Sequence, residues 1–253
     1  MVYDLQKASF WKRIAAWIFD SILLCVLAVG VGVILSWTLK YDSYNNSIEN
    51  AYAKYEAQYD ITFDISQETY EAMTEEERGQ YDAAYDALIS DKDAMHAYNM
   101  VLNLTLIILS AAILLAILIL EFVVPLFLKN GQTFGKRMFS IGLVRPDCVK
   151  ITGLQLFVRT LLGKYAVETM IPVYVLLMLF WGSIDLMGTV LLAALLLAQI
   201  IVVAVNRNRS ALHDLMAATV VVDISSQMVF DTQQDLIEYK QKIHAEMAAR
   251  QNY

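Results

Sequence analysis

The sequence predicts an all-α fold: a polytopic membrane protein with four transmembrane helices, a cytoplasmic interfacial amphipathic helix and a helical extracytoplasmic insert. Hydrophobic residues make up 58% of the 253-residue chain and charged residues only 18%, a balance too apolar for an ordinary soluble domain. The excess lies in four long apolar segments, and an apolar helix of about 20 residues crosses the hydrocarbon core of a bilayer. These two observations predict an integral membrane protein.

The four apolar segments set the expected organisation of the chain. We expect spans from about Ile14 to Leu39, Val101 to Leu128, Tyr165 to Trp181 and Leu186 to Val205, and hence segments 1–39, 40–99, 100–128, 129–164, 165–205 and 206–253. Only Gly182–Asp185 separates the last two spans, so they should form a hairpin. Pro125 lacks an amide proton and should kink or relax the inner end of the second span. The first span is longer than a signal-peptide core and no Ala-x-Ala site follows it, so it should remain as an anchor.

Basic and acidic residues are segregated along the chain, although the formal net charge is −7. Residues 129–164 hold seven basic residues and one acidic residue, whereas residues 40–99 hold fourteen acidic and four basic ones. Lys and Arg near span ends concentrate on the cytoplasmic side of membrane proteins. Four spans place residues 129–164 on the same side as both ends of the chain, where Lys12, Arg13 and Arg209 add positive charge. We therefore expect a multi-pass protein of the plasma membrane with cytoplasmic N- and C-termini.

The acidic segment 40–99 should form a small helical domain outside the membrane. Aromatic and aliphatic residues recur at helical spacing between Ser47 and Tyr59, and Thr74 followed by Glu77 is the pattern of a helix N-terminal capping box. The many tyrosines of this insert suit a wet seam between helices. A surface that binds a cation or a basic protein partner is the alternative.

The basic segment 129–164 should contain two ordered features at the membrane surface. Arg145–Asp147 separates two short apolar runs, which predicts a turn or hairpin. From Thr152 a short helix follows, with apolar residues on one face and Arg159 and Lys164 on the other. Such a helix is typical of the headgroup plane, so we expect anionic lipid rather than nucleic acid as the partner of this segment.

Several charged residues fall inside or beside the predicted spans and form the candidate site. An aspartate inside a membrane helix costs on the order of 2.5–3.5 kcal/mol, so it is retained where it has a partner or a task. Asp20 is such a residue, and it shares a helix face with Arg13, about 10 Å away along the axis. We expect a charge network near the cytoplasmic side, whose members are Arg13, Asp20, Glu121, Arg137, Arg159, Glu168, His213 and Asp214.

Two interpretations of this network remain open. In the first, buried ion pairs pin the first helix to the later segments. In the second, the network is a polar site that exchanges protons with a cation, or that holds an anionic solute through Arg13 and Arg159. Four helices leave little room for a complete pathway, so a transport role predicts a homo-oligomer. Glu168 also lies four residues after Lys164, which predicts a local ion pair.

Enzymatic activity is not expected. The sequence has no nucleophile motif such as Gly-x-Ser-x-Gly beside His213 and Asp214, no metal-ligand spacing, and no phosphate-loop spacing in residues 131–137. Cys25 lies in the first apolar segment and Cys148 in the basic segment, so a disulfide between them is not expected either. We therefore predict no cofactor and no metal.

Three blocks of the sequence resemble the RDD family of small bacterial membrane proteins. They are Arg13 with Asp20, the block Gly131-Gln132-Thr133-Phe134-Gly135-Lys136-Arg137, and Arg209-Ser-Ala-Leu-His213-Asp214 with Ala217 and Thr219. The arginine and two aspartates that name the family correspond to Arg13, Asp20 and Asp214. Ser140 and Ala218 stand where glycine is usual, and residues 40–99 look like an insertion.

The resemblance implies a transport role, with cation/proton antiport suggested for some members of the family. The sequence therefore predicts a solute transporter that uses an intramembrane Asp–Arg network near the cytoplasmic side. The alternative is a structural or accessory membrane protein that transports nothing and whose acidic insert, residues 40–99, binds a protein partner.

Overall fold

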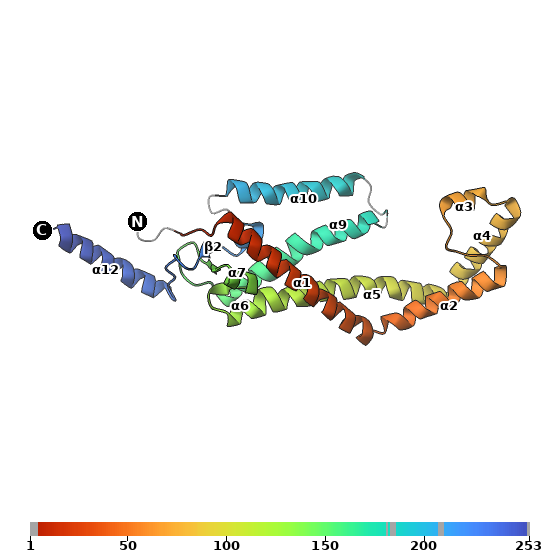
Figure 1. The fold of residues 1–253 in the computed structure, drawn as a ribbon, viewed down its shortest axis with the longest axis horizontal. Coiled ribbons are helices and arrows are strands. Elements are labelled where there is room, and N and C mark those ends of the chain that lie inside the picture. Colours follow the sequence, from red (N-terminus) through yellow and green to blue (C-terminus); the bar gives the residue numbers. More distant parts are fainter. Residues whose placement is uncertain (1–4, 181, 183–185, 207–209, 252–253) are drawn as a thin grey trace. The chain divides into compact units, whose positions relative to one another are not determined.

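The computed structural model describes residues 5–180, 182, 186–206 and 210–251. The chain is 77% helical, and it divides into two compact units, which are described separately. The first unit comprises Met1–Ala28 and Ile113–Tyr253, and the second comprises Val29–Ala112. Figure 1 shows the helices in sequence colours. The helical membrane protein expected from the sequence is confirmed at this level.

Among the described residues, three helical segments are long and apolar enough to cross a membrane. They are α1 (Phe10–Thr38), the run Lys92–Phe127 and the run Gly153–Met178. The second run comprises α5 (Lys92–Ile117), the π-helical segment η1 (Leu118–Val123) and α6 (Val124–Phe127). The third run comprises α8 (Gly153–Phe157), the π-helical segment η3 (Val158–Met170) and most of α9 (Ile171–Phe180). A further apolar helix, α10 (Leu186–Val205), falls where the fourth span is expected. Of the turn expected before α10, only Gly182 lies within the described residues.

Pro125 lies where the helical geometry of the second run changes. It lies in α6, directly after the π-helical segment Leu118–Val123. In a regular helix, the amide of residue 125 would donate to the carbonyl of Glu121, and proline has no such amide. The freed carbonyl of Glu121 instead accepts a hydrogen bond from the buried Thr160 hydroxyl at 3.0 Å. The proline therefore opens this helix to a contact with η3.

Two predicted segment boundaries have no counterpart as breaks in the helices. Residues 99 and 100 both lie inside α5, and the helix runs without interruption from α8 through η3 across residues 164 and 165. The helix that begins with α8 starts where the sequence predicts, because Thr152 and Gln155 form a capping box there. The position of residues 153–164 in the headgroup plane stays a prediction.

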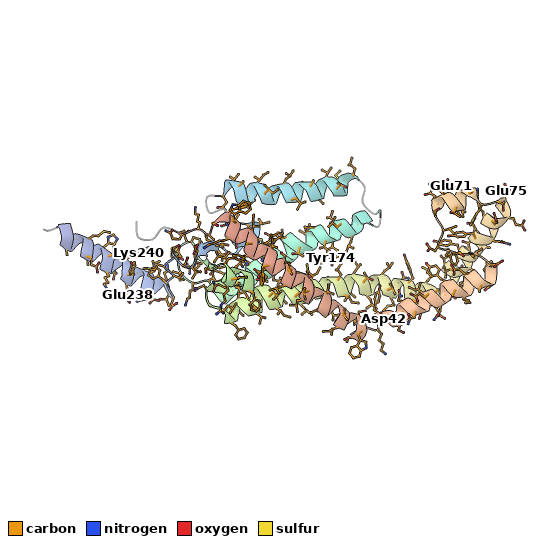
Figure 2. All side chains as sticks on the ribbon, in the orientation of Figure 1. Asp42, Glu71, Glu75, Tyr174, Glu238 and Lys240 are labelled. Carbon is orange, nitrogen blue, oxygen red and sulfur yellow. The ribbon has the colours of Figure 1, made fainter. Side chains whose placement is uncertain are left out.

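The second unit has a helical core of its own. Within it, α2 (Tyr41–Tyr59), α3 (Gln67–Ala72) and α4 (Glu75–Ser90) precede α5, and Tyr55, Leu88 and Ala94 form the buried cluster. The expected capping box begins α4, with Glu77 accepting from the Thr74 amide at 2.8 Å. Figure 2 draws the side chains and labels Glu71 and Glu75, both of which are exposed.

A small β-sheet in the first unit departs from the all-α prediction. Strand β1 (Ile141–Val144) pairs antiparallel with β2 (Val220–Asp223), with Val144 opposite Val220. The expected turn at Arg145–Asp147 does form, because the Arg145 amide donates to the Val149 carbonyl at 2.9 Å. However, β1 takes β2 as its strand partner, since the valines of β2 are buried and β-branched side chains suit such a pair.

The remaining elements of the first unit are short, apart from the C-terminal helix. They are the 3-10 turn η2 (Lys129–Gly131), α7 (Phe134–Met138), α11 (Leu212–Met216) and α12 (Gln233–Gln251). In the last of these, Leu236 packs with Cys148, Val149 and Phe230. The short helices α7 and α11 contain residues of the second and third sequence blocks, and both contribute to the candidate site.

Candidate functional site

The carboxylate of Asp20 is held by the start of α7. Oδ1 accepts from the Gly135 amide at 2.8 Å, and Oδ2 accepts from the Thr133 hydroxyl at 2.5 Å. Thr133 is also the N-cap of α7 and accepts from the Lys136 amide. The first amides of a helix have no partner within it and favour an anion. A hydroxyl and a backbone amide therefore hydrogen-bond both oxygens of the Asp20 carboxylate.

Gly135 permits the close approach of α1 and α7. A Cβ atom at this position would lie 2.4 Å from the Ala16 carbonyl oxygen and 2.9 Å from Cγ of Asp20, which no side chain can occupy without a shift of the backbone. The Gly135 position of the second sequence block is thus explained by packing against the first helix. The block and Asp20 form one structural unit.

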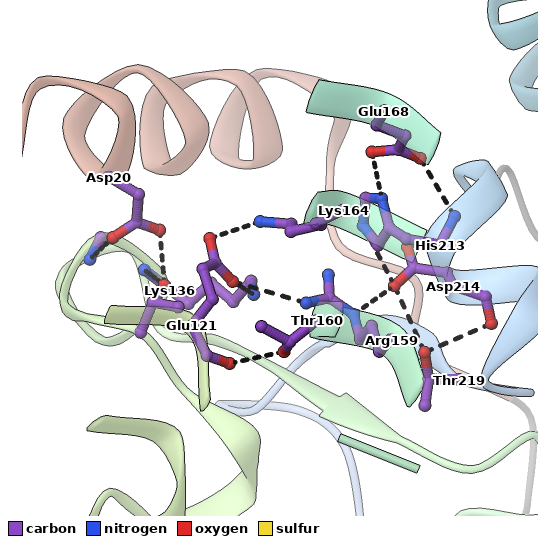
Figure 3. Close-up of polar contacts among 12 residues, drawn as sticks. Asp20, Glu121, Lys136, Arg159, Thr160, Lys164, Glu168, His213, Asp214 and Thr219 are labelled. Atoms are coloured by element: carbon purple, nitrogen blue, oxygen red, sulfur yellow. Dashed lines mark hydrogen bonds and ion pairs between the residues drawn. The ribbon is translucent and has the colours of Figure 1, made fainter. Parts of the chain in front are cut away.

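Glu121 is the acidic centre of the next part of the cluster (Figure 3). It belongs to η1 and is only 6% exposed. Lys164 contacts its Oε1 atom, while Arg159 Nη1 and Lys136 Nζ lie 3.5 Å and 3.7 Å from Oε2. Three positive groups from η3 and α7 therefore surround one buried carboxylate.

Arg159 joins Glu121 to Asp214. It is 1% exposed, and its Nε donates to Asp214 Oδ1 at 2.8 Å. Thr219 donates to the same oxygen at 3.3 Å, and Arg13 Nη2 lies 3.7 Å from Asp214 Oδ2. Removing one partner from a buried ion pair typically costs about 3–5 kcal/mol, because the other charge is left uncompensated. The Arg159 guanidinium therefore links two segments that are distant in sequence.

Glu168 pairs with His213 instead of Lys164. The His213 amide donates to Oε1 at 3.0 Å, and ring atom Nδ1 lies 2.7 Å from Oε2. Because a carboxylate can only accept, Nδ1 carries the proton in this contact. The predicted local pair between Lys164 and Glu168 is replaced by these bonds, since Lys164 reaches the more deeply buried Glu121.

Of the eight residues expected in the network, Arg137 alone points elsewhere. Its side chain is exposed, and Lys136, the preceding residue, faces the cluster. Successive residues of a helix point about 100° apart, so α7 can direct only one of the two inwards. Lys136, Thr160, Lys164 and Thr219 are the members of the cluster that the network prediction omitted, although Lys136 and Thr219 lie in the family blocks.

The other motif residues have structural roles or lie outside the described residues. Gln132 donates to the Ile141 carbonyl at 2.9 Å, which ties the loop to β1. Gly131 has a φ of +58°, and a Cβ there would lie 2.5 Å from Cδ1 of Ile151. Arg209 lies outside the described residues.

The cluster borders a cavity of about 310 Å³. The charged and imidazole side chains of its wall are Arg13, Asp20, Glu121, Lys136, Arg159, Lys164, His213 and Asp214. Phe10, Ile14 and Trp17 of α1 supply part of the apolar wall. Within the described residues, no group of three or more His, Cys, Asp or Glu side chains could hold a metal ion.

Burial shifts the protonation of groups outside the apolar helices. It lowers the pKa of the Lys136 ammonium, and Arg159 nearby adds to this effect. It likewise lowers the pKa of His213, despite the opposing effect of Asp214. Burial would raise the pKa of Asp214, but His213 and Arg159 outweigh it and hold that pKa below its ordinary value. The cluster therefore favours a charged Asp214 and a neutral His213.

The fold and the cluster together define a helical membrane protein with a buried ionic network. The sequence profile of the RDD family matches residues 7–218. The chain therefore belongs to the RDD family, a family of membrane proteins, as the three blocks indicate. Comparisons with curated proteins and with solved structures gave no match.

Substituting Gly135 tests the contact between α1 and α7. Gly135→Ala should destabilise the protein by roughly 1–3 kcal/mol, as overpacking does, because its Cβ would overlap the Ala16 carbonyl and Asp20. Thermal unfolding of the detergent-purified protein, followed by circular dichroism, measures the change. Gly30→Ala is the matched control, since nothing lies within 4 Å of its Cβ and alanine favours a helix. Equal losses in both variants would contradict the close contact.

The lowered pKa of His213 predicts a loss of stability in acid. The unfolded chain binds a proton at this imidazole more readily than the folded chain, so stability should fall as the pH drops below the ordinary value of 6.5. Glu168, Asp214, Arg159 and Lys164 are the charged groups that act on the ring. His213→Asn should reduce the difference between the melting temperatures at pH 7.5 and pH 5.5.

The exposed His244 in α12 provides the matched control for that measurement. Its substitution, His244→Asn, should leave the pH dependence unchanged, because this exposed side chain is not part of the charge cluster. If the two variants have the same pH dependence as the wild type, His213 does not contribute to acid destabilisation.

Proposed function

We propose that this protein is a membrane transporter in which the buried charge cluster exchanges a cation for protons. The observation that carries the proposal is the cluster itself: buried and half-buried acids and bases from α1, η1, α7, η3 and α11 meet beside a cavity in an apolar helical unit. Ionisable residues inside membrane helices are costly, and they commonly mark ion pathways and proton relays. Ion pairs that only stabilise the fold would need no cavity beside them.

The charge balance of the cluster supports exchange rather than net uptake of charge. The acids are Asp20, Glu121, Glu168 and Asp214, and the bases are Arg13, Lys136, Arg159 and Lys164. Opposite charges compensate one another there, and an additional charge in a medium of low dielectric constant is costly. A cation that enters such a site is best accommodated when a proton leaves.

The proposal includes a topology and an assembly. Four spans, with α10 as the fourth, give cytoplasmic termini and an extracytoplasmic segment 40–99 in the plasma membrane. The joining of residues from segments 13–20, 133–136 and 213–214 in one cluster supports their position on the same side. Because the helices of one chain leave little room for a pathway, the transporter is a homo-oligomer. Its basic segment 129–164 contacts anionic lipid, and the chain catalyses no reaction.

Asp20→Asn tests the transport proposal. Asparagine retains the shape of the side chain, and its carbonyl can still accept from the Gly135 amide while its amide donates to Thr133. Only the charge is lost, so the fold should persist while proton-coupled cation flux falls at least tenfold. Liposomes with a trapped pH dye, exposed to gradients of Na⁺, K⁺ or Li⁺, measure the flux.

The matched control is Asp147→Asn, because Asp147 pairs with Arg145 outside the cluster at a partly exposed site. It should retain the wild-type flux. A wild-type protein that moves none of these cations, or an Asp20→Asn variant with undiminished flux, would contradict the proposal.

A second candidate function rests on the separate helical unit. Val29–Ala112 forms a compact unit with its own core, and it carries the acidic segment 40–99. In this alternative the protein is an accessory membrane protein, and exposed acids of α3 and α4 such as Glu71 and Glu75 bind a basic partner protein.

Deleting residues 42–97 separates the two functions. The transport proposal expects the deletion variant, closed by a short Gly/Ser linker, to retain cation flux, because the cluster lies within the other unit. The accessory function predicts no cation flux from the full chain or from the deletion variant. It also predicts that a partner protein crosslinks in intact cells to a photoreactive residue placed at position 85, and that this crosslink is lost in the deletion variant. If the deletion variant loses cation flux while the Asp20→Asn variant keeps it in full, the transport site does not lie in the charge cluster.

A further inference from the structure

The cavity beside α1 is lined by both apolar and charged side chains. Phe10 and Trp17 form part of its apolar wall, and with exposed fractions of 54% and 64% both also reach the surface of the apolar helix. Four basic and three acidic side chains line the same cavity, namely Arg13, Lys136, Arg159, Lys164, Asp20, Glu121 and Asp214. A ligand that fills this space needs an apolar body and a polar headgroup.

The Lys136 ammonium indicates that the headgroup is an acceptor. Its Nζ atom is buried and has no hydrogen-bond partner, and Glu121 Oε2 is 3.7 Å away. Both oxygens of Glu121 are already engaged by Lys164 and Arg159, and both oxygens of Asp20 by Thr133 and Gly135. A buried ammonium without an acceptor is costly. The neighbouring acids thus bond to other groups and leave Lys136 Nζ without a hydrogen bond, and an oxygen from a ligand would satisfy it.

Asp214 adds a second requirement. Its Oδ2 atom is also buried without a hydrogen-bond partner, while Arg13 lies 3.7 Å away. A carboxylate ligand supplies only acceptors, whereas a singly ionised phosphate monoester supplies acceptor oxygens together with one P–OH donor. The phosphate monoester thus matches both unsatisfied groups of the cavity.

We propose that this cavity binds the phosphate-monoester headgroup of an amphiphile, with Lys136 and Arg13 on the phosphate oxygens, Asp214 accepting from the P–OH, and the apolar chain along Phe10, Ile14 and Trp17. This site does not require transport, because it holds equally for an accessory membrane protein. Its occupant has the chemistry of a phosphatidate lipid, and the same headgroup chemistry exists in free phosphate.

Trp17 reports binding directly. The full chain in neutral detergent is titrated with dioctanoyl phosphatidate, with dioctanoyl phosphatidylcholine, and with inorganic phosphate, while tryptophan emission is recorded. We expect a saturable change with phosphatidate and at least tenfold weaker binding of phosphatidylcholine, whose phosphate is a diester with no P–OH. Trp17→Phe should abolish the signal. Inorganic phosphate that binds as tightly as phosphatidate would assign the cavity to the free ion and would overturn the role of the apolar wall.

Two kinds of variant separate the headgroup from the chain. Lys136→Gln should weaken phosphatidate binding at least tenfold, and Lys136→Arg should restore most of it. Phe10→Ser, at an exposed position that need not disturb the fold, should weaken phosphatidate binding but not phosphate binding. Equal responses to the two lipids, or phosphatidate binding unchanged in both Lys136→Gln and Phe10→Ser, would overturn the proposal. Binding is measured without a gradient, so its failure is distinct from a failure of cation flux.

Discussion

The first unit depends on the ion pairs that the buried Arg159 guanidinium makes with two acids. This guanidinium lies between Glu121 of η1 and Asp214 of α11 and is almost inaccessible to solvent. Each carboxylate would be strongly destabilising at its depth without a positive partner. One side chain of η3 therefore fixes the positions of two other segments. Lys164 and Arg13 complete the arrangement, one on each of the two acids.

Departures from regular helix geometry make this arrangement possible. Pro125 removes a donor within the second run, so the Glu121 carbonyl turns to Thr160 while its side chain meets Arg159. Gly163 allows η3 to approach α11, because a Cβ there would lie 2.5 Å from Cβ of His213. π-helical segments such as η1 and η3 occur frequently at functional sites. The irregular helices and the charge cluster are thus one feature of the structure, not two.

The sequence predicts those parts of the fold and site that depend on local pattern. Apolar length, capping boxes and the proline effect follow from neighbouring residues, and the costs of buried charge single out most members of the cluster. Pairing choices depend on residues far apart in the chain. The partner of β1, the selection of Lys136 over Arg137, and the exchange of partners between Lys164 and Glu168 are set by tertiary packing. Local spacing carries no information about them.

The partners of Asp20 change how the cluster has to be understood. A carboxylate that accepts from a hydroxyl and a backbone amide is well hydrogen bonded and keeps its negative charge. That charge also acts on Lys136, and it raises the pKa that burial lowers. Lys136 therefore lies between two acids, Asp20 and Glu121, without a hydrogen bond to either. An ammonium in this position can respond to a ligand or a proton with a small displacement, whereas Arg159, with its bonds to two acids, cannot. The cluster thus combines a fixed charge that holds the helices together with an adjustable charge that faces the cavity.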